Sequence, residues 1–232
     1  ETSTPGIYTL HLAGMGPGTN NFTAVATDAA GNVGSASSVF AVTIDSQAPN
    51  APTLALANGV STGATAAEAT AVGGVASVTA ESGSSVSVVF TNTTNNNTVT
   101  KTLTGTGSAQ AVVLTAADVA ALGDGAISVD AVATDTAGNA STAGSASFAL
   151  DTVAPLVAVT STALTANATP IISGTAEAGA TVDVTVAGAT YTVVATGGVW
   201  SVDTANDLPS SGTLALDING SNAVSAVATD AA

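Results

Sequence analysis

The chain has 232 residues and combines many small side chains with a one-sided charge. It has 16 acidic residues against a single lysine or arginine, Lys101, so the formal net charge is -15 at pH 7. Such a surface has no cations to neutralise phosphate groups, which makes nucleic acids and anionic membranes poor candidates as partners. Hydrophobic residues make up 46% of the chain. Polar residues and Gly interrupt every apolar run before the ~18 residues of a spanning helix, so we expect no membrane insertion.

Cysteine is absent from the sequence, which excludes disulfides, thiol catalysis and cysteine-bound zinc. Small extracellular modules often depend on disulfides, so a chain without them needs another kind of staple. An acidic surface with almost no internal counter-charge repels itself, and multivalent cations relieve that repulsion. Composition therefore gives a first indication of bound calcium.

One passage of the sequence occurs three times, at residues 24–49, 131–155 and, in shortened form, 226–232. Its repeated Asp28 and Asp135 are 135 − 28 = 107 residues apart, which predicts one module of sandwich size per repeat. Because the repeat is cut at both ends, we expect the chain to be a window from a longer tandem array. The predicted division is 1–46, an incomplete module with C-terminal strands only; 47–152, a complete module; and 153–232, a module lacking its last strand.

Short runs of Val and Thr between clusters of Gly, Asn and Ser predict an all-β sandwich. Val86, Val88 and Phe90 alternate with polar residues, so their side chains should share the buried face of one strand. A short helix is expected at 115–122, with Thr115 as its N-cap and Gly123 at its end. In the complete module we expect seven strands, the number of an immunoglobulin-like domain, near residues 53–57, 75–80, 86–91, 98–104, 109–114, 127–134 and 145–150.

The third module repeats this scheme, and its missing final strand would leave a sheet edge unpaired. The linkers at 45–52 and 151–155 are short and contain proline, so they should be stiff. The predicted fold is therefore all-β, with tandem immunoglobulin-like β-sandwich modules in an elongated array. Strands of the third module are expected near residues 171–175, 181–186, 191–195, 199–202, 214–218 and 223–229.

Acidic residues recur at the expected joints between modules. In an immunoglobulin-like sandwich, the loop between the second and third strands, the loop between the sixth and seventh, and the entry to the first strand meet at one pole. Three carboxylates with carbonyl oxygens would suit Ca²⁺, with an affinity of about 10⁻⁴ to 10⁻³ M. The predicted ligands are Asp45, Glu81, Asp135 and Asn139 at the first joint, Asp151, Glu177 and Asp230 at the second, and, as a weaker pair, Asp28 and Asn32.

The pair Asp135 and Asn139 has a second interpretation, in which both residues cap a tight turn through bonds to the backbone. Turn chemistry explains each motif alone, but not why a linker acid and a Glu-containing turn recur with it at both joints. We expect the other loop acids to be solvated surface and find no partner for Glu68 or Asp183. These other loop acids are Asp118, Asp124, Asp203, Asp207 and Asp217.

Enzymatic function is not expected. The single His11 lies outside the complete module, and the acids recur at the joints instead of converging in one cleft. Lys101 could in principle form an isopeptide crosslink with an Asn or Asp, but a crosslink that acts as a staple should recur with the repeat. Two Tyr and one Trp are too few to form the aromatic platforms of carbohydrate-binding modules.

Four passages together, AVATDTAGNAS, LDTVAP, GTAEAGATV and GSAQAVVLTAADVAALGDG, resemble the tandem bacterial immunoglobulin-like repeats of giant biofilm-associated adhesins secreted by type I systems. The resemblance covers the second and third modules and the tail of the first. It implies an extracellular stalk on the bacterial cell surface, which takes part in adhesion and biofilm formation and holds calcium between neighbouring modules. The alternative is a self-assembling extracellular filament or sheath subunit, in which separate chains pair by strand addition.

Overall fold

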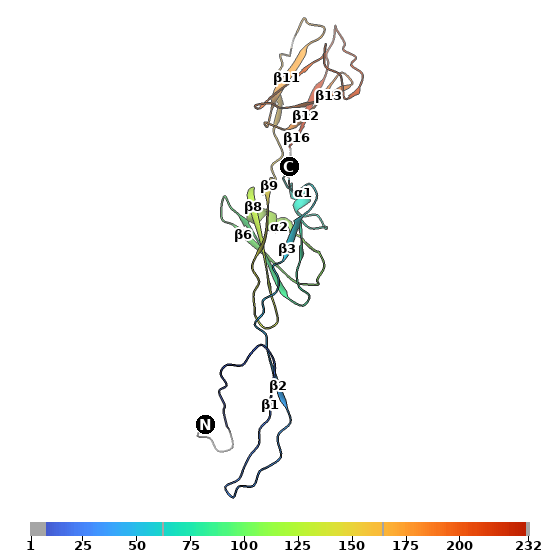
Figure 1. The fold of residues 1–232 in the computed structure, drawn as a ribbon. Coiled ribbons are helices and arrows are strands. Elements are labelled where there is room, and N and C mark those ends of the chain that lie inside the picture. The colour runs from blue at the N-terminus through green and yellow to red at the C-terminus, as the bar shows by residue number, and fades with distance from the viewer. Residues whose placement is uncertain (1–7, 62, 164, 231–232) are drawn as a thin grey trace.

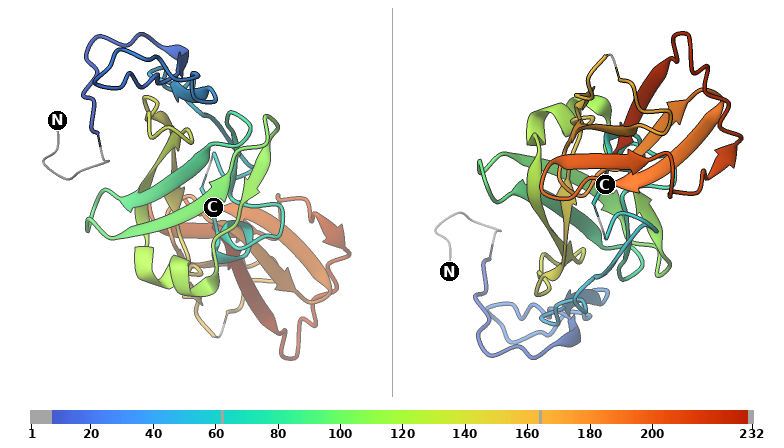
Figure 2. Two further views of the ribbon diagram at one scale, coloured as in Figure 1. Left: turned by 90° about the horizontal axis from the view of Figure 1, so that it is seen from below. Right: turned by 90° about the horizontal axis from the view of Figure 1, so that it is seen from above.

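The structure, a computed structural model, describes residues 8–61, 63–163 and 165–230. It consists almost entirely of antiparallel strands, with two short helices, so the predicted all-β fold is confirmed. Three bodies follow one another along one axis (Figure 1). We call them the hairpin segment (residues 8–44), the central sandwich (53–150) and the C-terminal sandwich (157–230). Viewed along that axis in Figure 2, the first and third bodies lie on opposite sides of the second.

The central sandwich has seven strands in two sheets. One sheet contains β3 (Thr53–Leu56), β4 (Ala76–Thr79) and β7 (Gln110–Val112). The second sheet has the order β6 (Thr98–Thr104), β5 (Ser85–Asn92), β8 (Gly125–Thr134) and β9 (Gly144–Leu150). The first, second and fifth strands of the sandwich thus form one layer. In the other layer, the sixth strand lies between the third and the seventh, as in immunoglobulin-like domains.

Alternation along the strands builds the core of the central sandwich, as the sequence predicts. Val86, Val88 and Phe90 on β5 are fully buried. On β8, every second residue from Ile127 to Ala133 is also fully buried, because β5 pairs with one edge of β8 and β9 with the other. The aromatic ring of Phe148 on β9 seals the same core.

Two capping boxes start the helices of the central sandwich. The predicted helix is present as α2 (Ala116–Leu122), with Thr115 as N-cap and Gly123 at its end. A second helix, α1 (Ala66–Ala69), was not predicted from the sequence. It starts at Thr65, whose side chain accepts a bond from the Glu68 amide, while the Glu68 carboxylate accepts bonds from the Thr65 amide and hydroxyl. Glu68 therefore has a capping partner that the sequence analysis did not identify.

The C-terminal sandwich has the same first layer, β10 (Val157–Val159), β11 (Ile171–Ala176) and β14 (Val199–Asp203). Its core packs around the buried rings of Tyr191 and Trp200, and the Trp200 indole donates to the Thr175 carbonyl at 3.2 Å. The strand β10 was missing from the prediction. The second sheet has the order β15 (Ser211–Gly212), β13 (Ala189–Val194), β12 (Thr181–Val186) and β16 (Val224–Thr229).

The prediction of a strand at 214–218 is wrong. The edge strand is the two-residue β15 instead, and Leu214 and Leu216 pack half-buried on the core without joining a sheet. The reason lies in a local turn around Asp217, whose carboxylate accepts the Asn219 amide at 2.9 Å and whose own amide donates to the Asn222 side chain at 2.8 Å. These side-chain bonds occupy the backbone groups that a strand would use.

The hairpin segment pairs β1 (Gly18–Phe22) with β2 (Phe40–Ile44) and has no core of its own: none of the residues 8–44 is buried. Its register equals that of β8 and β9, because Gly18 opposes Ile44 as Gly125 opposes Leu150. The hairpin segment is therefore the structural counterpart of the last two strands of the central sandwich.

Gly174 on β11 is a position where any side chain would collide with the core. A Cβ there would lie 2.1 Å from the Ala158 carbonyl oxygen and 2.2 Å from the Trp200 ring. We expect Gly174→Ala to destabilise the C-terminal sandwich by about 3 kcal/mol, as overpacking at a backbone contact does. The fluorescence of Trp200, the only tryptophan, should report this as an earlier urea midpoint.

The matched control for this substitution is Gly179→Ala. Gly179 has a φ of +93°, but a Cβ there would meet nothing within 4 Å, so only the backbone conformation is unfavourable, by about 1 kcal/mol. Equal midpoints for the two variants would contradict the packing argument.

Candidate functional site at the joints between the bodies

Strand registers bring the segments that carry the predicted calcium ligands to the same poles. In the central sandwich, Ser85 at the start of β5 opposes Thr134 at the end of β8, so the turn with Glu81 and the turn with Asp135 share one end. In the C-terminal sandwich, Thr181 opposes Thr229 in the same way, which places Glu177 and Asp230 at one end. Both ends face the linker that enters the sandwich, because β3 and β10 start there.

At the first joint, the turn between β8 and β9 contacts the incoming linker. The Asn139 side-chain amide donates to the Asp45 main-chain carbonyl at 3.2 Å, across 94 residues of sequence. Pro49 and Pro52 are buried, and the Pro52 carbonyl lies so close to Gly144 that a Cβ on that glycine would sit 1.8 Å from the oxygen. The sequence-predicted residues Asp45 and Asn139 thus meet through a hydrogen bond.

The carboxylate of Asp135 is occupied by its own turn. Its Oδ1 accepts the amides of Ala137 and Asn139 at 2.8 and 2.9 Å, and its Oδ2 accepts the Asn139 side chain at 2.9 Å. Hydrogen bonding, first from the Asn139 side chain, holds the pKa of Asp135 below its usual value, so the group is ionised at neutral pH.

The pair Asp28 and Asn32 in the hairpin segment forms the same turn. Asp28 accepts the amides of Ala30 and Asn32 and the Asn32 side chain at 2.8 to 2.9 Å, and the Asn32 side chain is the first cause of its lowered pKa. Asx-turn chemistry therefore accounts for the Asp-x-x-x-Asn motif in both bodies. The recurring linker and Glu-turn acids remain as the basis of the calcium hypothesis.

The two linker acids also repeat each other. Asp45 Oδ1 accepts the Gln47 amide at 3.0 Å, and Asp151 Oδ1 accepts the Val153 amide at 3.1 Å. Each bond fixes the three residues directly before an Ala-Pro pair. The Glu81 and Glu177 side chains are exposed at the ends of their turns, where their main-chain carbonyls accept bonds from Ser84 and Ala180.

No three acidic or histidine side chains gather closely enough to hold a metal ion within the described ranges 8–61, 63–163 and 165–230. The structure therefore brings the acid-bearing segments to the joints without assembling their carboxylates into one cage. The metal site at Asp45, Glu81 and Asp135, and its counterpart at Asp151, Glu177 and Asp230, stays a prediction.

The second joint depends on a residue that the sequence analysis assigned to solvated surface. Asp124, in the turn between α2 and β8, accepts both the amide and the hydroxyl of Thr152 through Oδ1, at 2.9 and 2.7 Å. One residue earlier, the Asp151 amide donates to the Ala64 carbonyl at 3.0 Å. The linker thus leaves the central sandwich bonded on two sides. The sequence signals that could have indicated this contact are the Asp124-Gly125 pair at the start of β8 and the Asp151-Thr152 pair after β9.

Asparagine side chains hold the end of α2, next to Asp124. Asn92 is fully buried and donates to the carbonyls of Leu122, Gly123 and Asp124 at 2.9 to 3.1 Å. Asn95 and Asn97 donate to the last carbonyls of the same helix. Because these carbonyls have no partner within the helix, the asparagines satisfy groups that otherwise need water, and they fix the position of Asp124.

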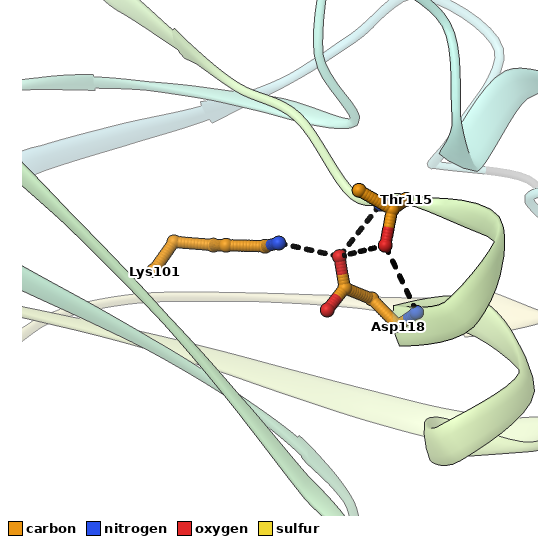
Figure 3. A network of polar contacts seen from close by, with 3 residues as sticks. All are labelled: Lys101, Thr115 and Asp118. Carbon is orange, nitrogen blue, oxygen red and sulfur yellow. Dashed lines mark hydrogen bonds and ion pairs between the residues drawn. The ribbon is translucent and has the colours of Figure 1, made fainter.

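Lys101 forms an ion pair with Asp118, and Asp118 also closes the capping box of α2 with Thr115 (Figure 3). The hydrogen bond from Lys101, with those from Thr115, lowers the pKa of Asp118 to about 2. An isopeptide bond would require a protonated carboxyl group and a neutral amine. A carboxylate with this pKa favours the ion pair instead. Asp118 is therefore a helix-capping residue, in contrast to the predicted solvated surface.

Comparison with known proteins identifies no family. No family model matches the chain, and no curated protein matches it either. Among solved structures, the chain is similar to the FN1–FN3 domains of chicken CNTN1, with 12% sequence identity, a TM-score of 0.33, and coverage of 92% of this chain and 71% of that one. In the part of the chain that the structure describes, no helix has the length and apolarity to cross a membrane.

Removing the Asp124 carboxylate should loosen the second joint. Asp124→Ala removes two hydrogen bonds to Thr152, each contributing about 1 kcal/mol, so a non-specific protease should cut the linker at least about fivefold faster. Asp130→Ala is the matched control, since it removes an equal charge whose bond to Ser145 lies within the sheet. Equal cleavage rates in the two variants would show that Asp124 does not restrain the linker.

The ion pair predicts a pH dependence for the central sandwich. Because folding lowers the pKa of Asp118 from 3.8 to about 2, its contribution is full above pH ~4 and is lost as the pH falls toward 2. Asp118→Asn should lose about 1–2 kcal/mol at pH 7 and show a flatter decline of unfolding free energy between pH 4 and 2. Asp130→Asn, measured in the same way, should keep the slope of the parent chain; a parent-like slope in Asp118→Asn would refute the assignment.

Proposed function

We propose that the chain is a structural extender, a stalk segment of an extracellular bacterial surface adhesin that takes part in adhesion and biofilm formation. The observation that carries the proposal is the end-to-end arrangement of three bodies along one axis, joined by short linkers (Figure 1). A protein whose bodies are connected in this way separates two points in space. The adhesin assignment rests on the sequence resemblance alone.

The contacts at the linkers support a stiff connection. Three kinds of contact restrict rotation at the linkers: the burial of Pro49 and Pro52, the Asn139 bond to the Asp45 carbonyl, and the Asp124 bonds to Thr152. A flexible linker would have none of these contacts. Proline also fixes its own φ angle. A stalk needs this stiffness, because a freely jointed chain of the same length would collapse on average to a shorter span.

Calcium at the joints is the second part of the proposal. The turns that carry Glu81 and Asp135 lie at one pole, and those that carry Glu177 and Asp230 at another, each next to a linker with its own acid, Asp45 or Asp151, in a chain of net charge -15. Carboxylate and carbonyl oxygens are the ligands that Ca²⁺ prefers, and their mutual repulsion without a cation would loosen the joint.

Small-angle scattering at constant ionic strength, together with a thermal melt, tests the calcium-stiffened stalk. With free calcium at ten times its Kd, we expect a larger maximum dimension, a higher melting temperature and about 1.4 kcal/mol of stabilisation. These effects should be much reduced in Asp151→Asn, Glu177→Gln.

The matched control is Asp130→Asn, Asp183→Asn, which also removes two charges, from acids that bond Ser145 and Thr192 on the strand faces. It should respond to calcium as the parent chain does. If neither the dimension nor the melting temperature of the parent moves, the joint acids are turn and surface residues and the calcium part of the proposal falls.

A further inference from the structure

We propose that Asn58 is a site of spontaneous deamidation, and that the modified residue loosens the second joint. This inference goes beyond the stalk and does not depend on it. Asn58 and Gly59 form an exposed turn of the central sandwich, between β3 and α1. The helix α1 lies at the end of this sandwich that faces the C-terminal sandwich (Figure 1). A change in the turn therefore acts close to the second joint.

The turn presents the two groups that react in deamidation. Asn58 is exposed, and its side chain makes no hydrogen bond to another residue that the structure describes, so its amide carbon can rotate toward the next main-chain nitrogen. The next residue, Gly59, has a φ of +91° and no side chain to block that approach. In the sequence, Asn is followed by Gly only here and at Asn219–Gly220.

The reaction needs water alone. The amide nitrogen of Gly59 loses its proton and bonds to Cγ of Asn58, and the side-chain nitrogen leaves as ammonia, which closes a succinimide ring. Water then breaks one of the two C–N bonds in this ring. Breaking the bond to Cγ gives aspartate, and breaking the bond to the main-chain carbonyl carbon gives isoaspartate, in which the main chain runs through the side-chain carbons. No group is oxidised or reduced.

Isoaspartate does not fit the span that holds this turn. On one side, the Ala57 amide donates to the Val75 carbonyl at 3.0 Å, and on the other side Val60 is fully buried in the core. Isoaspartate lengthens the main chain between these points by one C–C bond, about 1.5 Å. A close-packed core resists such a shift, so the displacement passes along the chain. Beyond Val60, the Ala64 carbonyl accepts the Asp151 amide at 3.0 Å, which is one of the bonds that hold the linker.

Both products also add a negative charge beside Glu68. A Cβ on Gly59 would lie 3.1 Å from Glu68 Oε1, so this glutamate already approaches the turn. Its Oε2 accepts the Thr65 amide and hydroxyl in the capping box of α1. A new carboxylate repels Glu68 and weakens this cap. Because Thr65 directly follows Ala64, the added length and the added charge act on the same segment.

Mass spectrometry of the folded chain after prolonged incubation tests the site. Lys101 is the only lysine or arginine, so trypsin applied after denaturation gives the fragments 1–101, with Asn58, and 102–232, with Asn219. We expect Asn58 to gain the mass difference between NH₂ and OH. Its conversion should be at least about tenfold faster than that of the other asparagines in its fragment, which precede a side chain, or about 1.4 kcal/mol in activation free energy. The rate should rise with pH, because a main-chain amide must lose its proton.

Asn58→Gln is the matched control for this assignment. It keeps a side-chain amide, but its longer side chain would have to close a larger ring, so the fragment 1–101 should not gain the mass at this position. Equal gains in the fragments of Asn58→Gln and of the parent chain would place the reaction elsewhere. Conversion of the urea-unfolded chain without conversion of the folded chain would show that the fold protects Asn58. Either result would overturn the proposal.

Digestion of the linker separates the effect of length from that of charge. Converted protein, enriched in isoaspartate, should be cut by a non-specific protease within 151–155 about threefold faster than the fresh parent chain, as expected for the loss of one hydrogen bond. Fresh Asn58→Asp adds the charge without lengthening the main chain, and its cleavage rate should lie between the two. Equal rates in the converted and the fresh parent chains would overturn the effect on the joint.

Discussion

The constraint on which this structure depends is that the sixth strand of each sandwich must be flanked on both edges before the core closes. In the central sandwich, β5 and β9 flank β8, and its inward residues are fully buried. In the C-terminal sandwich, β16 forms a ladder with β12 alone among the described residues, and the same inward positions are half-buried. In the hairpin segment, β1 and β2 form the pair without the sheet opposite, and no residue is buried. Because these cores consist mainly of Val and Ala, each contributing a small apolar area, the loss of one covering strand removes a large share of the burial.

The joints combine local turns with a few long-range bonds. Asp45 and Asp151 each fix the backbone of their own linker through a hydrogen bond within that linker. The long-range bonds then attach the linkers to the central sandwich, through Asn139 at one pole and Asp124 at the other. Asp124 in turn depends on Asn92, whose buried amide holds the end of α2. The central sandwich therefore orients both neighbours, while its neighbours contribute little to its own core.

The sequence predicts most of this fold where the spacing of apolar residues agrees with the preferences of the capping and turn residues around them. Alternation located β5, and the Thr115 cap with Gly123 located α2, because these signals act within a few residues. The segment 214–218 shows the limit: alternating Leu214 and Leu216 imitate a strand, but the turn at Asp217 takes the backbone bonds. For the site, topology correctly placed the acid-bearing turns at common poles. The roles of Asp124 and Asn92 were not predictable, because their partners lie about 30 residues away and meet them only through packing.

The negative charge of the chain acts on both joints. Hydrogen bonds lower the pKa of Asp28 and Asp135, so their turns keep full negative charge well below neutral pH, and the sequence offers only Lys101 to balance it. Contacts between bodies therefore form against repulsion. Monovalent salt screens it, since salt acts on every exposed charge within a Debye length. A coordinated divalent cation acts only where several oxygens converge. An elongation that appears on adding calcium at constant ionic strength thus belongs to the joints, and not to a general screening of charge.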